Sequence, residues 1–234
     1  MNKILSILAL IALTFTTNIN AQSLKSGKIV QELTEIKADD PTIGMQLEMM
    51  KGSTNTTFFT NDKVLTQVDM MGGMMQMKTL TNTADKTGYL LFDLSMLGLK
   101  NKVNITADDV VNNKENMADV TVTYDKSDTK EILGYTCHKA TISSPAMQGA
   151  EMTAYVTDQI EITADIIQGI SGDQIEGFPL EYSIGAQGMK MVYTTIEIND
   201  KIDASVFDVN TSGYEEMTME EFQKQMSSMG GMGF

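Results

Sequence analysis

The sequence predicts a mainly β protein built on an antiparallel sheet that curls. Three observations support this prediction. Apolar and polar residues alternate in several short segments, so one face of each segment would be buried and the other wet. Turn-forming residues separate these segments. Few stretches have the apolar spacing of a helix, whereas a parallel sheet would need helices to connect its strands.

Five segments show this alternation. In the first, Ile43, Met45, Leu47 and Met49 alternate with glycine or polar residues, which predicts a strand. Four further strands with the same period are predicted at residues 64–70, 120–124, 180–184 and 192–198. Turns are expected at residues 51–53, 61–62, 85–88, 125–128 and 199–200 and at Gly185 and Gly188.

Helices are expected at two places. Residues 218–221, Thr-Met-Glu-Glu, form a capping box, in which the threonine hydroxyl accepts from a first-turn amide and the glutamate reaches back. Met219, Phe222 and Met226 follow on one stripe at helical spacing, which predicts a helix near the C-terminus. A second, shorter helix is expected between residues 158 and 168.

The first 21 residues have the parts of a secretory signal. Lys3 precedes an apolar run at residues 4–13, and small residues end the segment at Ala21. The run is too short to span a bilayer, and Gln22, rather than a lipoprotein cysteine, would follow the cleavage site. We therefore expect a signal peptide at 1–21, one β domain at 22–226 and a flexible tail at 227–234. The protein would be periplasmic or secreted, not membrane-spanning and not lipid-anchored.

Charge and motif searches exclude several function classes. The chain has a net charge of −14 and no arginine, which is poorly suited to nucleic acid or anionic headgroups. Cys137 and His138 are the only cysteine and histidine, and neighbours on a strand point to opposite faces. No phosphate loop, dinucleotide fingerprint, nucleophile elbow or calcium loop is present. We expect no enzymatic activity, no disulfide and no cofactor.

Methionine is unusually frequent, with 20 residues, and three interpretations stay open. Flexible thioether side chains suit a groove for varied apolar ligands. Thioethers also bind Cu(I), or methionine fills the core. The candidate groove residues are Met45, Leu47, Met49, Val68, Met70, Met75, Met77, Met189 and Met191. The candidate copper ligands are Met70, Met71, Met74, Met75 and Met77.

The C-terminal half resembles a known family. Residues 130–140, KEILGYTCHKA, are similar to the I-x-G-Y-x-C-x-K strand of the DUF4412 family of exported proteins, common in the Bacteroidetes. Residues 177–182, 189–191, 206–209 and 213–217 follow in matching order, so the resemblance covers roughly 115–220. It implies a curved antiparallel half-barrel similar to the LolA/LolB carriers, with a helical lid over an apolar concavity. It implies no activity and no catalytic residue.

Together these observations predict an exported protein that binds or carries a hydrophobic, lipid-like ligand in the concave face of the sheet. A Cu(I)-binding, methionine-rich periplasmic module is the first alternative. The second is an envelope protein that binds a protein partner and no small ligand.

Overall fold

The computed structural model describes residues 23–109, 120–144, 150–162, 175–186 and 188–230. The strands are β1 Gly27–Ala38, β2 Thr54–Phe59, β3 Lys63–Met70, β4 Met75–Asn82, β5 Gly88–Leu94, β6 Leu99–Ile105, β7 Thr121–Ile132, β8 Tyr135–Ser143, β9 Glu151–Thr157, β10 Phe178–Ala186, β11 Met189–Asn199 and β12 Glu215–Met217. The helices are α1 Pro41–Glu48, α3 Met219–Gly230 and the 3-10 turns η1 Met71–Gly73, η2 Ser95–Leu97 and η4 Ala204–Phe207.

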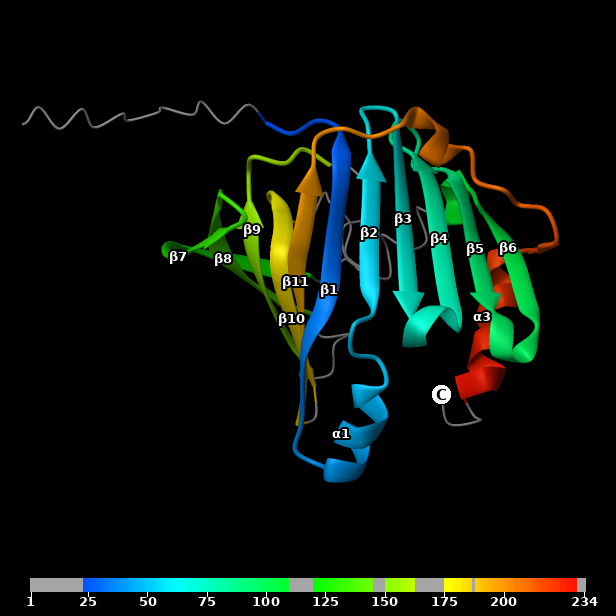
Figure 1. The fold of residues 1–234 in the computed structure, drawn as a ribbon, viewed down its shortest axis with the longest axis horizontal. Coiled ribbons are helices and arrows are strands. Elements are labelled where there is room, and N and C mark those ends of the chain that lie inside the picture. Colours follow the sequence, from blue (N-terminus) through cyan, green and yellow to red (C-terminus); the bar gives the residue numbers. More distant parts are fainter. Residues whose placement is uncertain (1–22, 110–119, 145–149, 163–174, 187, 231–234) are drawn as a thin grey trace, which may run out of the picture.

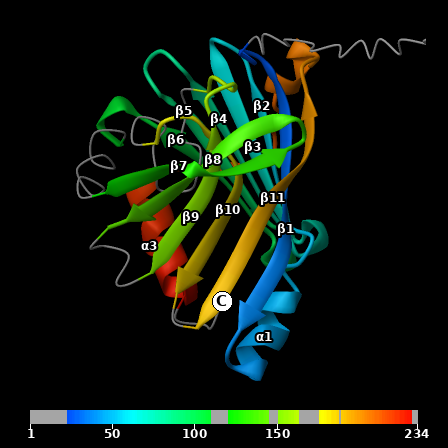
Figure 2. The same cartoon turned by 90° about the vertical axis from the view of Figure 1, so that its left-hand side faces the viewer.

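All twelve strands form one open sheet, in the order β12-β6-β5-β4-β3-β2-β1-β11-β10-β9-β8-β7. Figure 1 shows β6, β5, β4, β3, β2, β1 and β11 side by side in this order. Figure 2 shows that the sheet curves strongly, with β7–β9 in front of β4–β6. Helix α3 lies on the concave side. The predicted fold class, a mainly β protein with an open, curved, antiparallel sheet and a helix near the C-terminus, is confirmed.

Two pairings join distant parts of the chain. β1 pairs with β2 on one side and with β11 on the other, which connects the β1–β6 and β7–β11 halves. The chain then crosses the upper ends of several strands (Figure 1), where Phe207 of η4 is buried. This crossing segment leads into β12, which pairs parallel with β6 at the far edge of the sheet. This crossing places α3 beside β6.

The register assigns each strand residue to one face, because directly paired residues point to the same side. The face that carries Phe92 and Leu94 packs against Phe222 and Met226 of α3. We call this concave face the inner face and the opposite one the outer face. Most of the apolar core lies on the inner face.

The strand expected over residues 43–49 is wrong, because these residues belong to helix α1 and its C-cap. The Asp40 carboxylate caps the helix by accepting from the backbone N–H of Thr42 at 2.7 Å and of Ile43 at 3.3 Å. Pro41 supplies a fixed φ in the first turn. Asp-Pro is a helix-start pattern, and here it prevails over the period-two alternation. None of the helical residues is buried.

The turn expected at residues 125–128 is also wrong, since β7 continues through it as a bulge. The Asp125 carboxylate accepts from the backbone N–H of Ser127 at 2.9 Å, and pairing with β8 resumes at Thr129. The hairpin turn comes later, at Leu133 and Gly134, which both have positive φ. Local side chain–backbone bonds therefore bend this strand without ending it.

The turn expected at Gly185 is wrong too, because Gly185 lies within β10 and pairs with Lys190 of β11. Most of the other described segments follow the prediction. The strands expected at 64–70, 180–184 and 192–198 lie within β3, β10 and β11, and the C-terminal helix is α3. The helix continues to Gly230, so the expected domain end at residue 226 lies inside it. The described part of the helix expected at 158–168, residues 158–162, forms a turn and a bridge to Leu24 rather than a helix. The rest of that segment, the expected signal peptide and residues 231–234 lie outside the described residues. Within the described residues no helix is long and apolar enough to cross a membrane.

Candidate functional site

A strip of methionines lies on the inner face where β3 turns into β4. Met70 is paired with Met75, and Val68 with Met77. Met75 and Met77 are paired in turn with Leu94 and Phe92 of β5. Val68, Met70, Met75 and Met77 are all half-buried, and we call these four residues the methionine strip. The period-two pattern places them together, as the sequence predicts.

Helix α3 covers part of this methionine strip. The ring of Phe222 meets the ring of Phe92 edge-on, with 5.5 Å between their centroids. Met75, Met77 and Leu99 pack in the same cluster, together with Met226 of the helix. The capping box holds the start of α3, because the Thr218 N–H donates to the Glu221 carboxylate at 2.8 Å. The strip is thus covered by a helix whose contacting side chains, Phe222 and Met226, are themselves half-buried.

Two further candidate groove residues lie on the same face in β11. Met191 is paired with Ile184 of β10 and with Ile36 of β1. Met189 is two residues away, and both methionines are half-buried. The sheet therefore brings six of the nine candidates to one face, although β1 and β2 separate Met189 and Met191 from the methionine strip.

The other three candidates lie elsewhere. Met45, Leu47 and Met49 are on or next to helix α1, below the ends of β1 and β2 in Figure 1. Met45 is 77% exposed and Met49 is 59% exposed. They do not share a strand face, because the segment is helical.

The part of the inner face formed by β8–β10 is closed by its own side chains. Its buried cluster consists of Ala140, Ile142, Met152, Ala154, Val156, Ile175 and Tyr182. The ring of Tyr182 stacks on the ring of Tyr193 at 4.9 Å. Burial, and secondarily the neighbouring Tyr193, raise the pKa of Tyr182, so this phenol stays neutral.

A polar patch interrupts the inner face between these two regions. Gln31 is 1% exposed and donates to the backbone carbonyl of Pro179 at 2.8 Å. It is paired with Asn55 on β2 and with Thr195 on β11. The Asn55 Oδ1 and Thr195 Oγ1 atoms are buried and find no hydrogen-bond partner within the described residues. The inner face is therefore two apolar regions rather than one continuous apolar groove.

Sequence reasoning missed this patch, although the pattern contains a sign of it. Gln31 occupies the same phase of the alternation as Ile29 and Leu33, and Asn55 the same phase as Phe59. A polar residue in the buried phase of a strand indicates an internal hydrogen bond or a ligand contact.

The cysteine and the histidine do not form a reactive pair. Cys137 and His138 are consecutive residues of β8, so their side chains point to opposite faces of the strand, as predicted. Cys137 is fully buried, and burial raises the pKa of its thiol to about 11, with a further contribution from Glu181. His138 is half-buried, with its ring 5.7 Å from that of Tyr124. A neutral, buried thiol is a poor nucleophile.

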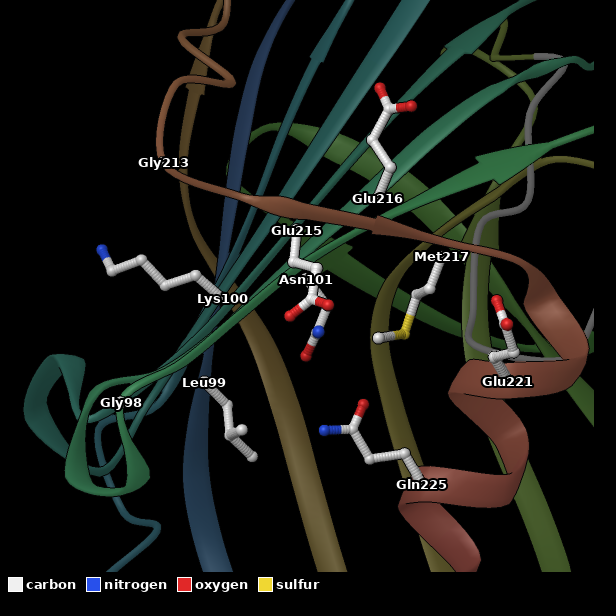
Figure 3. Close-up of a pocket in the computed structure, with 10 residues that line it drawn as sticks. All are labelled: Gly98, Leu99, Lys100, Asn101, Gly213, Glu215, Glu216, Met217, Glu221 and Gln225. Atoms are coloured by element: carbon white, nitrogen blue, oxygen red, sulfur yellow. The ribbon is translucent and has the colours of Figure 1, made fainter.

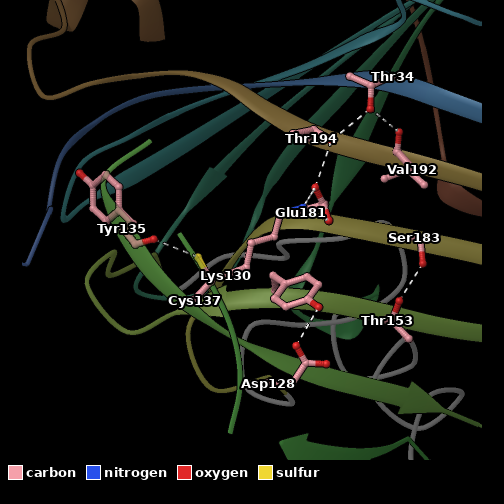
Figure 4. Close-up of polar contacts among 11 residues, drawn as sticks. Thr34, Asp128, Lys130, Tyr135, Cys137, Thr153, Glu181, Ser183, Val192 and Thr194 are labelled. Atoms are coloured by element: carbon pink, nitrogen blue, oxygen red, sulfur yellow. Dashed lines mark hydrogen bonds and ion pairs between the residues drawn. The ribbon is translucent and has the colours of Figure 1, made fainter. Parts of the chain in front are cut away.

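Several polar groups near Cys137 are paired with one another (Figure 4). The Lys130 ammonium lies 2.6 Å and 2.8 Å from the two carboxylate oxygens of Glu181, and 5.4 Å from the centre of the Tyr155 ring. The Tyr155 hydroxyl donates to Asp128 at 3.0 Å. These polar groups satisfy one another across β7, β9 and β10, next to the buried cluster that contains Cys137, Phe178 and Leu180.

The candidate copper ligands separate into two groups. Met70, Met75 and Met77 point to the inner face, whereas Met71 lies in the η1 turn and Met74 is the residue that caps its end. The sequence position of the cluster, strand–turn–strand, is as predicted. Within the described residues, no group of three or more histidine, cysteine, aspartate or glutamate side chains could hold a metal ion.

A second concavity, which the sequence did not indicate, lies where β6, β12 and α3 meet (Figure 3). This pocket has a volume of about 560 Å³. It is lined by Gly98, Leu99, Lys100, Asn101, Gly213, Glu215, Glu216, Met217, Glu221 and Gln225. It forms because β12, after the crossing, docks parallel to β6 and delivers α3 next to it.

Comparisons with known proteins add a distant likeness. No protein-family model and no curated protein sequence matches the chain. The solved structures with some similarity include the lipoprotein LppX of Mycobacterium tuberculosis, at 12% identity and a TM-score of 0.35, covering 77% of this chain and 89% of that one. LprF from Mycobacterium bovis has 11% identity and a TM-score of 0.34, with 82% and 92% covered. MucB has 9% identity and a TM-score of 0.31, with 82% and 59% covered. At these scores the likeness carries no inference about a ligand.

Proposed function

We propose that the protein is an exported carrier that binds an apolar, lipid-like ligand on the inner face, at the methionine strip beneath α3. The observation that carries the proposal is the half-buried state of Val68, Met70, Met75 and Met77 on a face otherwise closed by side chains. Removing apolar surface from water contributes about 25 cal/mol per Å². Unbranched thioether side chains adapt their shape to varied ligands.

Helix α3 would serve as the cover of the site. Its contacts with the sheet are few, and the Phe222 and Met226 side chains that make them are half-buried. Displacing such a helix exposes less apolar surface than opening the β8–β10 cluster would. The DUF4412 resemblance, the secretory signal and a LolA/LolB-like carrier role belong to the same proposal.

The test compares two methionine-to-aspartate variants. Met77→Asp would place a carboxylate in the methionine strip, and we expect at least a tenfold loss of affinity for a fluorescent long-chain fatty acid. Met45→Asp is the matched control, because Met45 is 77% exposed on α1 and should leave affinity within twofold. Circular dichroism confirms that both variants fold.

Equal losses in both variants, or no loss in Met77→Asp, would contradict the proposal. Native mass spectrometry of the protein purified without detergent gives an independent check, since a bound lipid adds its own mass. A bare mass together with no fatty-acid binding would favour the alternative of an envelope protein with a protein partner.

One observation favours Cu(I) as a second candidate. Met70 and Met75 are direct cross-strand partners, and Met77 follows on the same face. Three thioethers on one face are a set of soft ligands of the kind that Cu(I) accepts. Anaerobic Cu(I) titration should then give one tight site that is lost when these three methionines are changed to leucine. Unchanged copper binding in that variant would exclude the strip as the copper site.

A further inference from the structure

The pocket between β6, β12 and α3 contains two buried oxygen atoms that lack a partner. Asn101 is 3% exposed, yet its Oδ1 atom has no hydrogen-bond partner among the described residues. The same is true of the buried Oε1 atom of Gln225, on α3. Both side chains line this pocket. A buried acceptor without a partner costs free energy, so two of them in one pocket indicate a ligand that donates hydrogen bonds.

A carboxylate completes the set of acceptors. Glu215 of β12 is the register partner of Asn101, so the two side chains leave the sheet on the same side. Figure 3 shows them close to each other, with Gln225 reaching towards them from α3. Three acceptors from three elements therefore meet in one pocket.

The other charged groups around the pocket are already paired. The Lys100 ammonium lies 2.7 Å from Asp93, and the Lys102 ammonium 2.7 Å from Glu216. Lys100 and Glu216 point away from Asn101 in Figure 3. The Glu221 carboxylate accepts from Thr218 in the capping box. Glu215 is left as the pocket charge without an ion pair among the described residues, so the pocket presents a negative charge.

We propose that this pocket binds a primary ammonium group. Such a group has three N–H donors and a positive charge, which match the oxygens of Asn101 and Gln225 and the carboxylate of Glu215. Leu99 and Met217, which also line the pocket, would contact the carbon chain that carries the amine. The volume of about 560 Å³ leaves room for that chain.

The chemistry of the pocket disfavours a divalent metal ion. Calcium takes six to eight oxygen ligands, commonly including several carboxylates. Here one unpaired carboxylate meets two amide oxygens, and the described residues contain no acidic cluster able to hold a metal. This inference does not depend on the proposed lipid site, because the pocket shares none of the four residues of the methionine strip.

Isothermal titration calorimetry with two matched small molecules tests the proposal. Ethanolamine carries a primary ammonium, whereas choline carries the same charge on a nitrogen without N–H donors. We expect saturable binding of ethanolamine that is at least tenfold tighter than that of choline. Lysophosphatidylethanolamine and spermidine, compared in the same way, distinguish a lipid headgroup from a free polyamine as the natural source of the ammonium.

Two glutamates near the pocket provide the test variant and its control. Glu215→Gln should weaken ethanolamine binding about tenfold, whereas Glu220→Gln, at an exposed position of α3 that does not line the pocket, should change it less than twofold. Gln225→Met removes one acceptor from a helix position and should also weaken binding. If Asn101→Leu does not fold, these variants still decide the question.

Three results would overturn the proposal. They are the absence of saturable ethanolamine binding, equal affinity for choline, and equal losses in the Glu215 and Glu220 variants. Calcium binding that competes with ethanolamine and depends on Glu215 would instead assign the pocket to a metal ion.

Discussion

The inner face is closed in two different ways at its two ends. At β8–β10, the side chains of the buried cluster fill the concave surface, and Ala140, Ile142 and Val156 are fully buried. At β4–β6, Phe92, Leu94 and Val103 are buried, and the neighbouring methionines are half-buried beneath α3. The first region is packed as a core, whereas the second is covered by a separate helix.

The difference follows from the residues that each region contains. Alanines and β-branched residues at β8–β10 have few rotamers and pack closely across paired strands. The unbranched methionines at β4 have several rotamers, and among the described side chains of the helix above them two, Phe222 and Met226, pack into this cluster. A ligand therefore displaces less structure at β4–β6, which is why the carrier proposal places it there.

The largest expected effect is on the packed end. Ile142→Ala should lower the free energy of unfolding by about 2–5 kcal/mol, since it leaves a cavity at a fully buried position. Met75→Ala, at a half-buried position, should cost less than half as much. Urea unfolding of the two variants measures both values. Equal losses would show that the two ends are packed alike.

The second effect concerns the attachment of α3. Phe222→Ala removes the ring that meets Phe92, and we expect a loss of about 1–3 kcal/mol, below that of a fully buried phenylalanine. Amide hydrogen exchange in residues 219–230 should become faster, while exchange in β8 and β9 stays unchanged. A uniform increase across the sheet would mean that α3 is part of the global core rather than a cover.

Thiol labelling offers a further test of the cover, because the native cysteine should not react with the label in the folded protein. Cys137 is fully buried, and its pKa is raised to about 11, so it should not react at neutral pH in the folded protein. A cysteine introduced by Met77→Cys should react slowly, and faster when combined with Phe222→Ala. A cysteine introduced by Ile142→Cys should react only on unfolding. Labelling of both at one rate would contradict the comparison.

The smallest effect is at the start of α3. Thr218→Ala removes the hydroxyl that accepts from the Glu221 N–H at 3.2 Å, at an expected cost of about 1 kcal/mol. The Thr218 backbone N–H, and then its side chain, hold the pKa of Glu221 below its ordinary value of 4.5. The carboxylate therefore stabilises the folded state above pH 4.5, and this contribution is lost as the pH falls through the lowered pKa.

The measurement for this last variant is hydrogen exchange in α3 as a function of pH. In the native protein, protection of α3 relative to β8 should decrease as the pH falls below 4.5. In Thr218→Ala the decrease should be smaller, since part of the bonding to Glu221 is already gone. The same decrease in both proteins would show that the capping box does not control the helix.

Several elements could be predicted from local sequence, because their causes are local. The period-two pattern of residues 64–70 and 192–198 predicts strands β3 and β11, and the capping box at Thr218 predicts α3. The segment at residues 43–49 shows where such a pattern fails. Its alternation fits a strand, yet the Asp40 cap and Pro41 make it a helix. Two local patterns competed there, and the capping bonds prevailed.

The sequence by itself determined that the protein is a mainly β structure with methionine-rich strands, an acidic surface and a capped C-terminal helix. Only the tertiary structure decided which of those methionines share a face, where the polar patch of Gln31, Asn55 and Thr195 interrupts it, and that Asn101, Glu215 and Gln225 meet in one pocket. Alternation and capping act over a few residues, and the sequence carries them directly. Pairing β1 with β11 and β12 with β6 brings together residues more than one hundred positions apart, and that depends on the register of the whole sheet.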